Sequence, residues 1–135
     1  MTHKGRRIAA LAIAGVLTLS ACGGGDTAVF DLTSAAESQV LLADAPSGLV
    51  ILDIRTPDEF NAGHLAGANN LDFYEPDFAA SLDELDKDLP YFVYCRSGNR
   101  SATAIETMKD LGFTEVYELD GGIVSWAEAG LPIDN

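Results

Sequence analysis

The chain has 135 residues, with eight basic residues against 21 acidic ones and a formal net charge of −13. A surface this acidic argues against electrostatic binding of nucleic acid or of anionic lipid headgroups, because both require clustered positive charge. Any basic residue that the fold places in a pocket is therefore a positive charge within an otherwise acidic protein.

The N-terminal segment has the composition of an export signal and not of a folded element. Three basic residues precede an almost unbroken apolar run over residues 8–19, which is shorter than the ~20 residues of a membrane-spanning helix. The run ends in Leu-Ser-Ala-Cys, and small residues before a cysteine at this place resemble the signal of bacterial lipoproteins. That resemblance implies that residues 1–21 are a signal peptide and that Cys22 becomes a lipidated N-terminus. A plain secretory signal with an incidental cysteine is the alternative.

Such a signal implies an exported protein, lipid-anchored to a bacterial membrane and facing the periplasm or the cell exterior. Cleavage would leave 114 of the 135 residues, enough for one modest domain. It would also leave five basic residues against 21 acidic ones, a net charge of −16. Glycines dominate residues 22–28, which we expect to form a flexible tether ahead of a domain over residues 29–135.

The two cysteines of the chain then have different fates. With lipid on Cys22, Cys95 is the only free thiol of the mature chain. A disulfide between the two is the alternative in an oxidising compartment. An unpaired cysteine in an exported protein indicates a chemical role.

Apolar runs and helical patterns alternate along the predicted domain. Ser34, with Glu37 three residues later, is typical of a capping box at a helix N-terminus. Residues 49–54 form a continuous β-rich run, as expected for a strand covered on both faces. Thr56 is expected to cap a short helix whose first position is Pro57.

The second half of the domain continues the alternation. Residues 74–90 are acidic and loop-like, with one or two helical turns within residues 78–85, and a helical face runs from Ser101 to a stop at Gly112. This alternation indicates an α/β domain with a central parallel sheet. In chain order, we predict strands over residues 29–32, 49–54, 68–71, 91–94 and 115–119, and helices over residues 34–43, 57–62, 101–111 and 122–129.

A cysteine follows the predicted strand over residues 91–94, and ligands in such sheets bind beyond the carboxyl ends of strands. The N-terminus of the next helix, Arg96 and Arg100 all favour an anion there, and we expect each to lower the pKa of the Cys95 thiol. Gly98 allows the loop to curl so that successive amides point inward and bind an anion. The sequence therefore predicts an ionised sulfur with an anion beside it; a buried core cysteine is the alternative.

Three stretches, over residues 51–73, 94–101 and 119–132, resemble the single-domain rhodanese family of sulfurtransferases. They read ILDIRTPDEFNAGHLAGANNLDF, YCRSGNRS and LDGGIVSWAEAGLP, and the likeness covers about residues 30–133. The resemblance implies a single α/β domain with a central parallel β-sheet flanked by helices. It also implies an active loop of six residues: Cys95, Arg96, Ser97, Gly98, Asn99 and Arg100.

By this resemblance, Cys95 attacks the outer sulfur of a small anionic donor such as thiosulfate, and sulfite leaves. The resulting persulfide passes its sulfur to an acceptor, cyanide or a thiol. The hydrogen-bonding groups of the loop would bind the sulfur donor and stabilise the terminal sulfur of the persulfide. Arg100, with Arg96, would pair with the oxygens of the sulfur donor. Neither a metal nor an organic cofactor is implied.

Two other functions are compatible with the same cysteine. Cell-cycle dual-specificity phosphatases and some arsenate reductases resemble rhodaneses, but their loop reads Cys-x5-Arg, which gives phosphate a wider cradle. Here four residues separate Cys95 from Arg100, which favours sulfur transfer. The second alternative is a persulfide carrier or binding module that hands its sulfur to one partner protein without turning over free thiosulfate.

Other candidate residues lie outside the loop. Asp53 and Arg55, just past a strand end, could line the pocket or form an ion pair that braces the following turn. We assign Asp53 to the brace and Arg55 to substrate binding.

His64 could act as a general base, but it lies in a loop beside two glycines, and the family resemblance implies a structural turn here, which is the role we assign to it. His64 with Asp58 or Glu59 could also suggest a metal site, but no second His or Cys cluster in the sequence completes one. Trp126 is predicted to anchor the last helix in the core.

Overall fold

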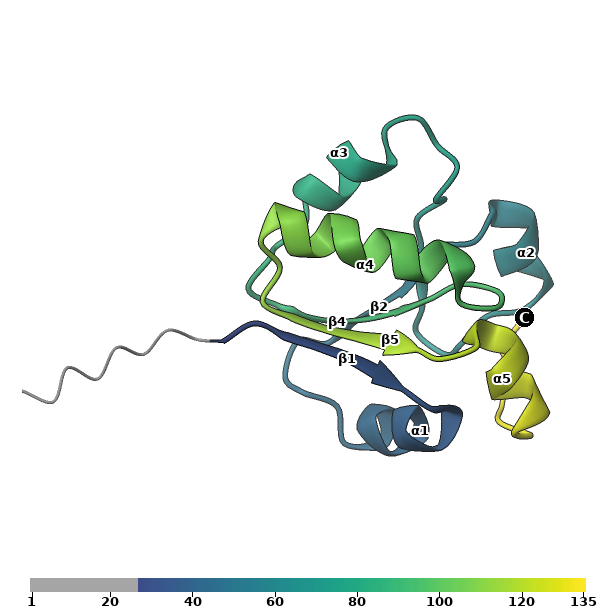
Figure 1. The fold of residues 1–135 in the computed structure, drawn as a ribbon. Helices are drawn as coiled ribbons and strands as arrows, with labels where there is room; N and C mark the ends of the chain where they lie inside the picture. Colours follow the sequence, from purple (N-terminus) through teal and green to yellow (C-terminus); the bar gives the residue numbers. More distant parts are fainter. Residues whose placement is uncertain (1–26) are drawn as a thin grey trace, which may run out of the picture.

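The computed structural model describes residues 27–135, and five parallel strands form a single sheet within them (Figure 1). The predicted signal peptide, Cys22 and most of the predicted tether lie outside the described residues. The strands are β1 (Val29–Thr33), β2 (Val50–Asp53), β3 (Asn69–Asn70), β4 (Pro90–Tyr94) and β5 (Glu115–Leu119). Their order in the sheet is β1-β5-β4-β2-β3, and every neighbouring pair is parallel.

Helices cover both faces of this sheet (Figure 1). On one face lie α1 (Ala35–Ala43) and α5 (Gly122–Glu128), and on the other lie α3 (Phe78–Asp83) and α4 (Asn99–Leu111). The short helix α2 (Pro57–Ala62) lies near the edge where the strands end. Among residues 27–135, none of the helices has the length and apolar character needed to cross a membrane. The predicted α/β domain with a central parallel sheet is confirmed.

Strand β4 lies in the middle of the sheet and is buried on both faces. Tyr91 and Val93 pack in the core on the side of α3 and α4, whereas Phe92 and Tyr94 pack in the core on the side of α1 and α5. Apolar contacts on two sides fix the backbone of the strand. The backbone that leads into the next residue, Cys95, is therefore held in a fixed position.

Local sequence signals explain where the first two helices begin. The Ser34 Oγ accepts a hydrogen bond from the amide of Glu37, and the Glu37 carboxylate accepts one from the amide of Ser34. This is the predicted capping box. Thr56 caps α2 in the same way, with Glu59 as its reciprocal partner.

Helix α4 begins at Asn99, two residues before the predicted start at Ser101. The residue before it, Gly98, has a φ of 104°, and its carbonyl accepts the first helical hydrogen bond, from the amide of Ala102. This cap depends on the backbone freedom of glycine and not on a capping side chain. The sequence therefore has no Ser, Thr or Asp at this place that would predict the start of the helix. As a result, Arg100 belongs to the first turn of the helix and not to the preceding loop.

Candidate active site

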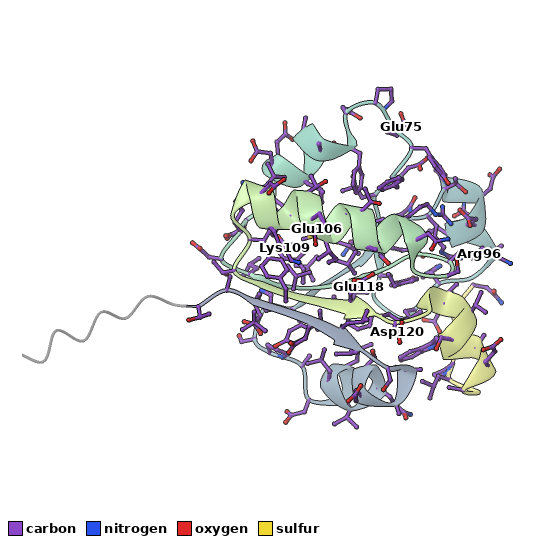
Figure 2. All side chains as sticks on the ribbon, in the orientation of Figure 1. Glu75, Arg96, Glu106, Lys109, Glu118 and Asp120 are labelled. Atoms are coloured by element: carbon purple, nitrogen blue, oxygen red, sulfur yellow. The ribbon has the colours of Figure 1, made fainter. Side chains whose placement is uncertain are left out.

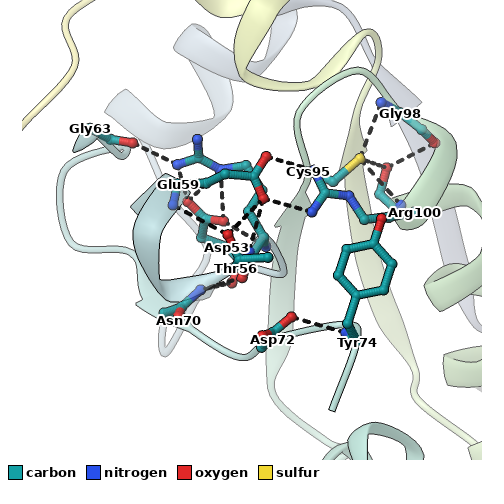
Figure 3. Close-up of polar contacts among 12 residues, drawn as sticks. Asp53, Thr56, Glu59, Gly63, Asn70, Asp72, Tyr74, Cys95, Gly98 and Arg100 are labelled. Carbon is teal, nitrogen blue, oxygen red and sulfur yellow. Dashed lines mark hydrogen bonds and ion pairs between the residues drawn. The ribbon is translucent and has the colours of Figure 1, made fainter. Parts of the chain in front are cut away.

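Cys95 lies directly after β4, where the chain turns toward α4 (Figure 3). Its Sγ accepts hydrogen bonds from the amides of Gly98 (3.1 Å) and Ser101 (3.4 Å), and the Ser101 Oγ lies 3.4 Å from the sulfur. Cys95 is buried, with 1% of its surface exposed. The backbone curls so that its amides converge on the sulfur, as was predicted from Gly98.

Hydrogen bonds favour the ionised form of this thiol. Burial opposes ionisation, but the hydroxyl and amide of Ser101 and the amides of Gly98 and Ser97 outweigh it and lower the pKa of Cys95. The groups that stabilise the thiolate are therefore amides and a hydroxyl. Arg96, which the sequence suggested as a contributor, lies exposed at the surface of the loop (Figure 2).

Arg100 is bound to a carboxylate from another helix. Its Nη1 and Nη2 donate to the two oxygens of Glu59 over 2.8 and 2.9 Å, which links α4 to α2 (Figure 3). The bond from Arg100, opposed by burial and reinforced by Thr56, lowers the pKa of Glu59 to about 2. The guanidinium carbon also lies 5.4 Å from the centre of the Tyr74 ring. The bond to Glu59 raises the pKa of Arg100 although burial opposes this, and the charges of Glu59, Tyr74 and Cys95 raise it further.

Arg55 is buried and braces the turn that follows β2. Its Nε donates to Asp53 Oδ1 over 3.0 Å, and its Nη2 donates to Asp53 Oδ2 and to the carbonyl of Gly63, both over 2.6 Å. Asn70 adds hydrogen bonds to the carbonyls of Asp53 and Arg55. Asp53 thus lies in the bracing ion pair to which the sequence assigned it. Substrate binding by Arg55 stays a prediction, and it requires the guanidinium to act while paired.

The N-terminus of α5 holds the loop from the other side. The amides of Ile123 and Val124 donate to the carbonyls of Cys95 (2.9 Å) and Arg96 (3.1 Å). Gly122 makes this approach possible, because a Cβ at that position would lie 2.5 Å from the carbonyl oxygens of both loop residues. The backbone of the active loop is therefore fixed by β4 at one end, α4 at the other and α5 alongside.

Known proteins share this fold. The family model described as "Rhodanese-like domain" matches residues 34–129, which is most of the chain. The chain belongs to the rhodanese-like domain family.

Individual relatives agree with this assignment. The chain is 43% identical over 81 residues to "Thiosulfate sulfurtransferase GlpE" of Stutzerimonas stutzeri, which covers 59% of this chain and 72% of that protein. It is 39% identical over 92 residues to a "Sulfurtransferase" of Allochromatium vinosum, which covers 68% of this chain and 83% of that protein. Among solved structures, a rhodanese-related protein from Thermoplasma volcanium has a TM-score of 0.67 at 31% identity, covering 77% of this chain and 97% of that one.

Two side chains of this rhodanese-like site were not predicted from the sequence. Ser101 was expected only as the start of a helix, although its place one residue after the six-residue loop is a signal that could have found it, because a first-turn amide faces an anion at that point. Glu59 was expected as an acid in a first helical turn, with no link to Arg100. It lies 41 residues from Arg100 in the chain, so no local spacing indicates their pairing.

His64 and Trp126 have the structural roles in the rhodanese-like domain that were predicted for them. The Nδ1 of His64 lies 2.9 Å from the carbonyl of Phe60, and the two rings stack with centroids 3.9 Å apart. Trp126 packs in the core beside α1, and its Nε1 donates to the carbonyl of Pro132. Within residues 27–135, no cluster of three or more His, Cys, Asp or Glu side chains is placed to hold a metal ion.

Proposed function

We propose that this rhodanese-like protein is a sulfurtransferase that moves a sulfane sulfur from a donor such as thiosulfate through a persulfide on Cys95. The observation that carries the proposal is the set of donors at Sγ, where the amides of Gly98 and Ser101 converge on a thiol with a lowered pKa. The relatives named as thiosulfate sulfurtransferase and sulfurtransferase support the same reaction.

The reaction has two steps whose atoms and charges balance. The Cys95 thiolate attacks the outer sulfur of thiosulfate, a new S–S bond forms, the S–S bond of the donor breaks, and sulfite leaves with the electron pair. Cyanide or a thiolate then attacks the outer sulfur of the persulfide, and Cys95 leaves as a thiolate. Each step begins or ends with negative charge on a sulfur that the loop amides can stabilise.

The burial of Cys95 restricts the groups that can react with it. Only 1% of the residue is exposed, so the outer sulfur of a donor must come to a thiolate that is almost wholly covered. A terminal sulfur atom is slimmer than a phosphoryl group with its oxygens. The loop with four residues between Cys95 and Arg100, one fewer than in the phosphatase-like alternative, therefore favours sulfur transfer.

Arg100 supplies positive charge for the donor by exchanging one anion for another. Its two-pronged contact with Glu59 has the geometry that the oxygens of a thiosulfate ion can also satisfy. We assign Arg100 the role of a clamp for the donor, in competition with Glu59. Exposed Arg96, on the same loop, is assigned the lesser role of attracting the anion.

We also propose that the domain works outside the cytoplasm, held to a bacterial membrane by lipid on Cys22. The support lies in the sequence, in the signal-like segment over residues 1–21 and the glycines that follow it. An acidic domain on such a tether would be repelled by anionic headgroups and would extend away from the membrane surface.

The reaction is tested by treating the purified full chain with thiosulfate and analysing the peptides of both cysteines by mass spectrometry. We expect one added sulfur atom on the peptide containing Cys95, and its loss when cyanide is added. Cys95→Ser should abolish both this label and thiosulfate:cyanide turnover, with an unchanged circular dichroism spectrum. Turnover at the wild-type rate in that variant would refute the assignment.

A further inference from the structure

A chain of hydrogen bonds leads from Cys95 to a carboxylate on β5. The Cys95 Sγ donates to the Ser101 Oγ over 3.4 Å, and the Ser101 Oγ donates to Glu118 Oε1 over 2.8 Å. Ser101 is fully buried, which shields this path from competing water. We propose that Glu118 accepts the thiol proton of Cys95 through the Ser101 hydroxyl, and that it is thereby a positioning residue for the sulfur chemistry.

The Ser101 hydroxyl has one proton and two acceptors within reach. The Glu118 carboxylate lies at 2.8 Å and the carbonyl of Gly98 at 3.2 Å. The carboxylate is both the nearer and the charged acceptor, so it takes the hydroxyl proton while Cys95 is neutral. The Ser101 Oγ then accepts a hydrogen bond from the thiol, so each group on the path from Cys95 to Glu118 has a hydrogen-bond partner.

Glu118 lies on the face of β5 that α4 covers (Figure 2). Its partly exposed side chain lines a hollow of ≈190 Å³ between β1, β5 and α4, together with Phe30 and Lys109. None of residues 95–100 lines this hollow. A proton that reaches Glu118 can therefore pass to water by a route separate from the active loop.

The surroundings of Glu118 make it a better proton acceptor than an ordinary surface carboxylate. Burial raises its pKa, the bond from Ser101 opposes this, Asp120 raises it further and Lys109 lowers it. Hydrogen bonds lower the pKa of Cys95 at the other end of the chain. The two pKa values are thus moved toward each other, which favours one proton shared between the two groups.

Other charged groups face the two ends of this chain. Asp31 and Glu106 line the hollow beside Glu118, and Glu106 pairs with Lys109 over 2.8 Å. Arg100 lies near the sulfur but is held by Glu59. Glu106 is therefore a carboxylate in the same hollow that is paired with a lysine and not with Ser101.

The transfer moves one proton along the chain and no electrons. The S–H bond of Cys95 breaks as the Ser101 Oγ takes that proton, while the original Ser101 proton passes to Glu118. Afterwards the Ser101 hydroxyl donates to the thiolate, and the Glu118 carboxyl donates to the hydroxyl. The inference rests on the proposed role of Cys95 as the reactive thiol, but the transfer itself requires no sulfur donor.

A thiol and a carboxyl that share a proton titrate as a coupled pair. Glu118→Gln removes the anion that opposes the thiolate and keeps an N–H that can donate to Ser101. We expect it to lower the pH midpoint of Cys95 ionisation by roughly one unit, or about tenfold more thiolate below the midpoint. Ser101→Ala should raise the midpoint, and Glu118→Gln should have little further effect in that background, because the path is already cut.

The experiment measures the rate of Cys95 alkylation by iodoacetamide against pH in the full chain, without thiosulfate. Mass spectrometry of the Cys95 peptide separates this reaction from that of Cys22. We expect two ionisations in the wild-type profile and one, at lower pH, in Glu118→Gln. Glu106→Gln is the matched control and should follow the wild type. Glu118→Ala removes the same charge if the glutamine variant does not fold.

Two results would overturn the relay. The first is a Glu118→Gln profile that superimposes on the wild-type profile. The second is an equal shift in Glu118→Gln and Glu106→Gln, because that indicates a diffuse effect of charge and not a path through Ser101. The proposed function fails in a different way, when thiosulfate adds no sulfur to Cys95 although the alkylation profiles shift as expected.

Discussion

Arg100 is the residue at which the resting structure and the proposed reaction differ most. Its ion pair with Glu59 is largely shielded, with 14% and 29% of the two side chains exposed. Two parallel hydrogen bonds between charged groups are stronger than a single surface contact. In the proposed reaction, an anionic donor must therefore displace an internal carboxylate, and the apparent affinity for the donor includes that cost.

Two variants separate the clamp from its competitor. Arg100→Ala should raise the KM for thiosulfate roughly tenfold or more, because a charge-assisted contact is lost, and should slow the acceptor step less. Glu59→Gln should lower that KM, since the cation is released to the donor. Stopped-flow measurement of each half-reaction provides the comparison. If Arg100→Ala slows both half-reactions equally, Arg100 is not a clamp for the donor.

The same pair predicts a difference in acid stability. The pKa of Glu59 is lowered from 4.5 to about 2, mainly by Arg100, so its ion pair stabilises the fold above pH 4.5 and is lost as the pH falls toward 2. The free energy of unfolding of the wild type should therefore exceed that of Glu59→Gln at neutral pH, and the gap should close over this range. Urea unfolding at several pH values measures the gap. Arg100→Ala should show the same convergence, and a gap that stays constant with pH would contradict this account.

At the scale of elements, the active loop depends on how closely α5 approaches it. Gly122 has a φ of +60°, and a Cβ there would lie 2.5 Å from carbonyl atoms of the loop. Gly130 has a similar φ of +73° but nothing within 4 Å of its Cβ position. The two glycines therefore share the left-handed backbone and differ in the space around it.

This pair of glycines allows a matched test. Both alanine substitutions carry the cost of a left-handed backbone, roughly 1–3 kcal/mol. Gly122→Ala should lose a further ~1–3 kcal/mol, because the loop must move away from α5. Urea unfolding gives the two free energies, and equal losses would show that close packing of α5 does not hold the loop. The alkylation rate of Cys95 should change in Gly122→Ala alone.

At the scale of the whole molecule, parallel strands bring distant segments to one edge of the sheet. The residues after β2 and β4 meet there because these two strands are neighbours, and β5 lies on the other side of β4. The site therefore combines Cys95 after β4, the α2 segment after β2 and the start of α5 after β5. A chain with the same loop but another strand order would not assemble it.

The proposed anchor belongs to the same scale, because it decides where the domain works. In a bacterial host, Cys22→Ala should move the protein from the membrane fraction to the soluble fraction, since the lipid has no attachment site. Its sulfur transfer activity should be unchanged, because the domain begins after the tether. Fractionation with immunoblotting and mass spectrometry of the N-terminal peptide measures this. A variant that stays with the membrane would show that lipid on Cys22 is not the anchor.

The sequence alone determined the class of fold and the place of the thiol that we propose to be reactive. The apolar run over residues 91–94, the glycine at position 98 and the spacing from Cys95 to Arg100 are properties of neighbouring residues, and they keep their meaning wherever the segment lies. The start of α4 was misplaced by two residues, because its glycine cap has no side-chain signal.

Only the tertiary structure decided which partner each polar group of the site has. Arg100 binds Glu59, 41 residues away, and Ser101 binds Glu118, 17 residues away. Arg55 is turned toward Asp53 within the same segment, although its sequence position is equally compatible with a place in the pocket. The strand order, and the burial that follows from it, decide which polar groups become partners. The sequence around a charged residue therefore does not indicate which opposite charge the fold will bring within 3 Å of it.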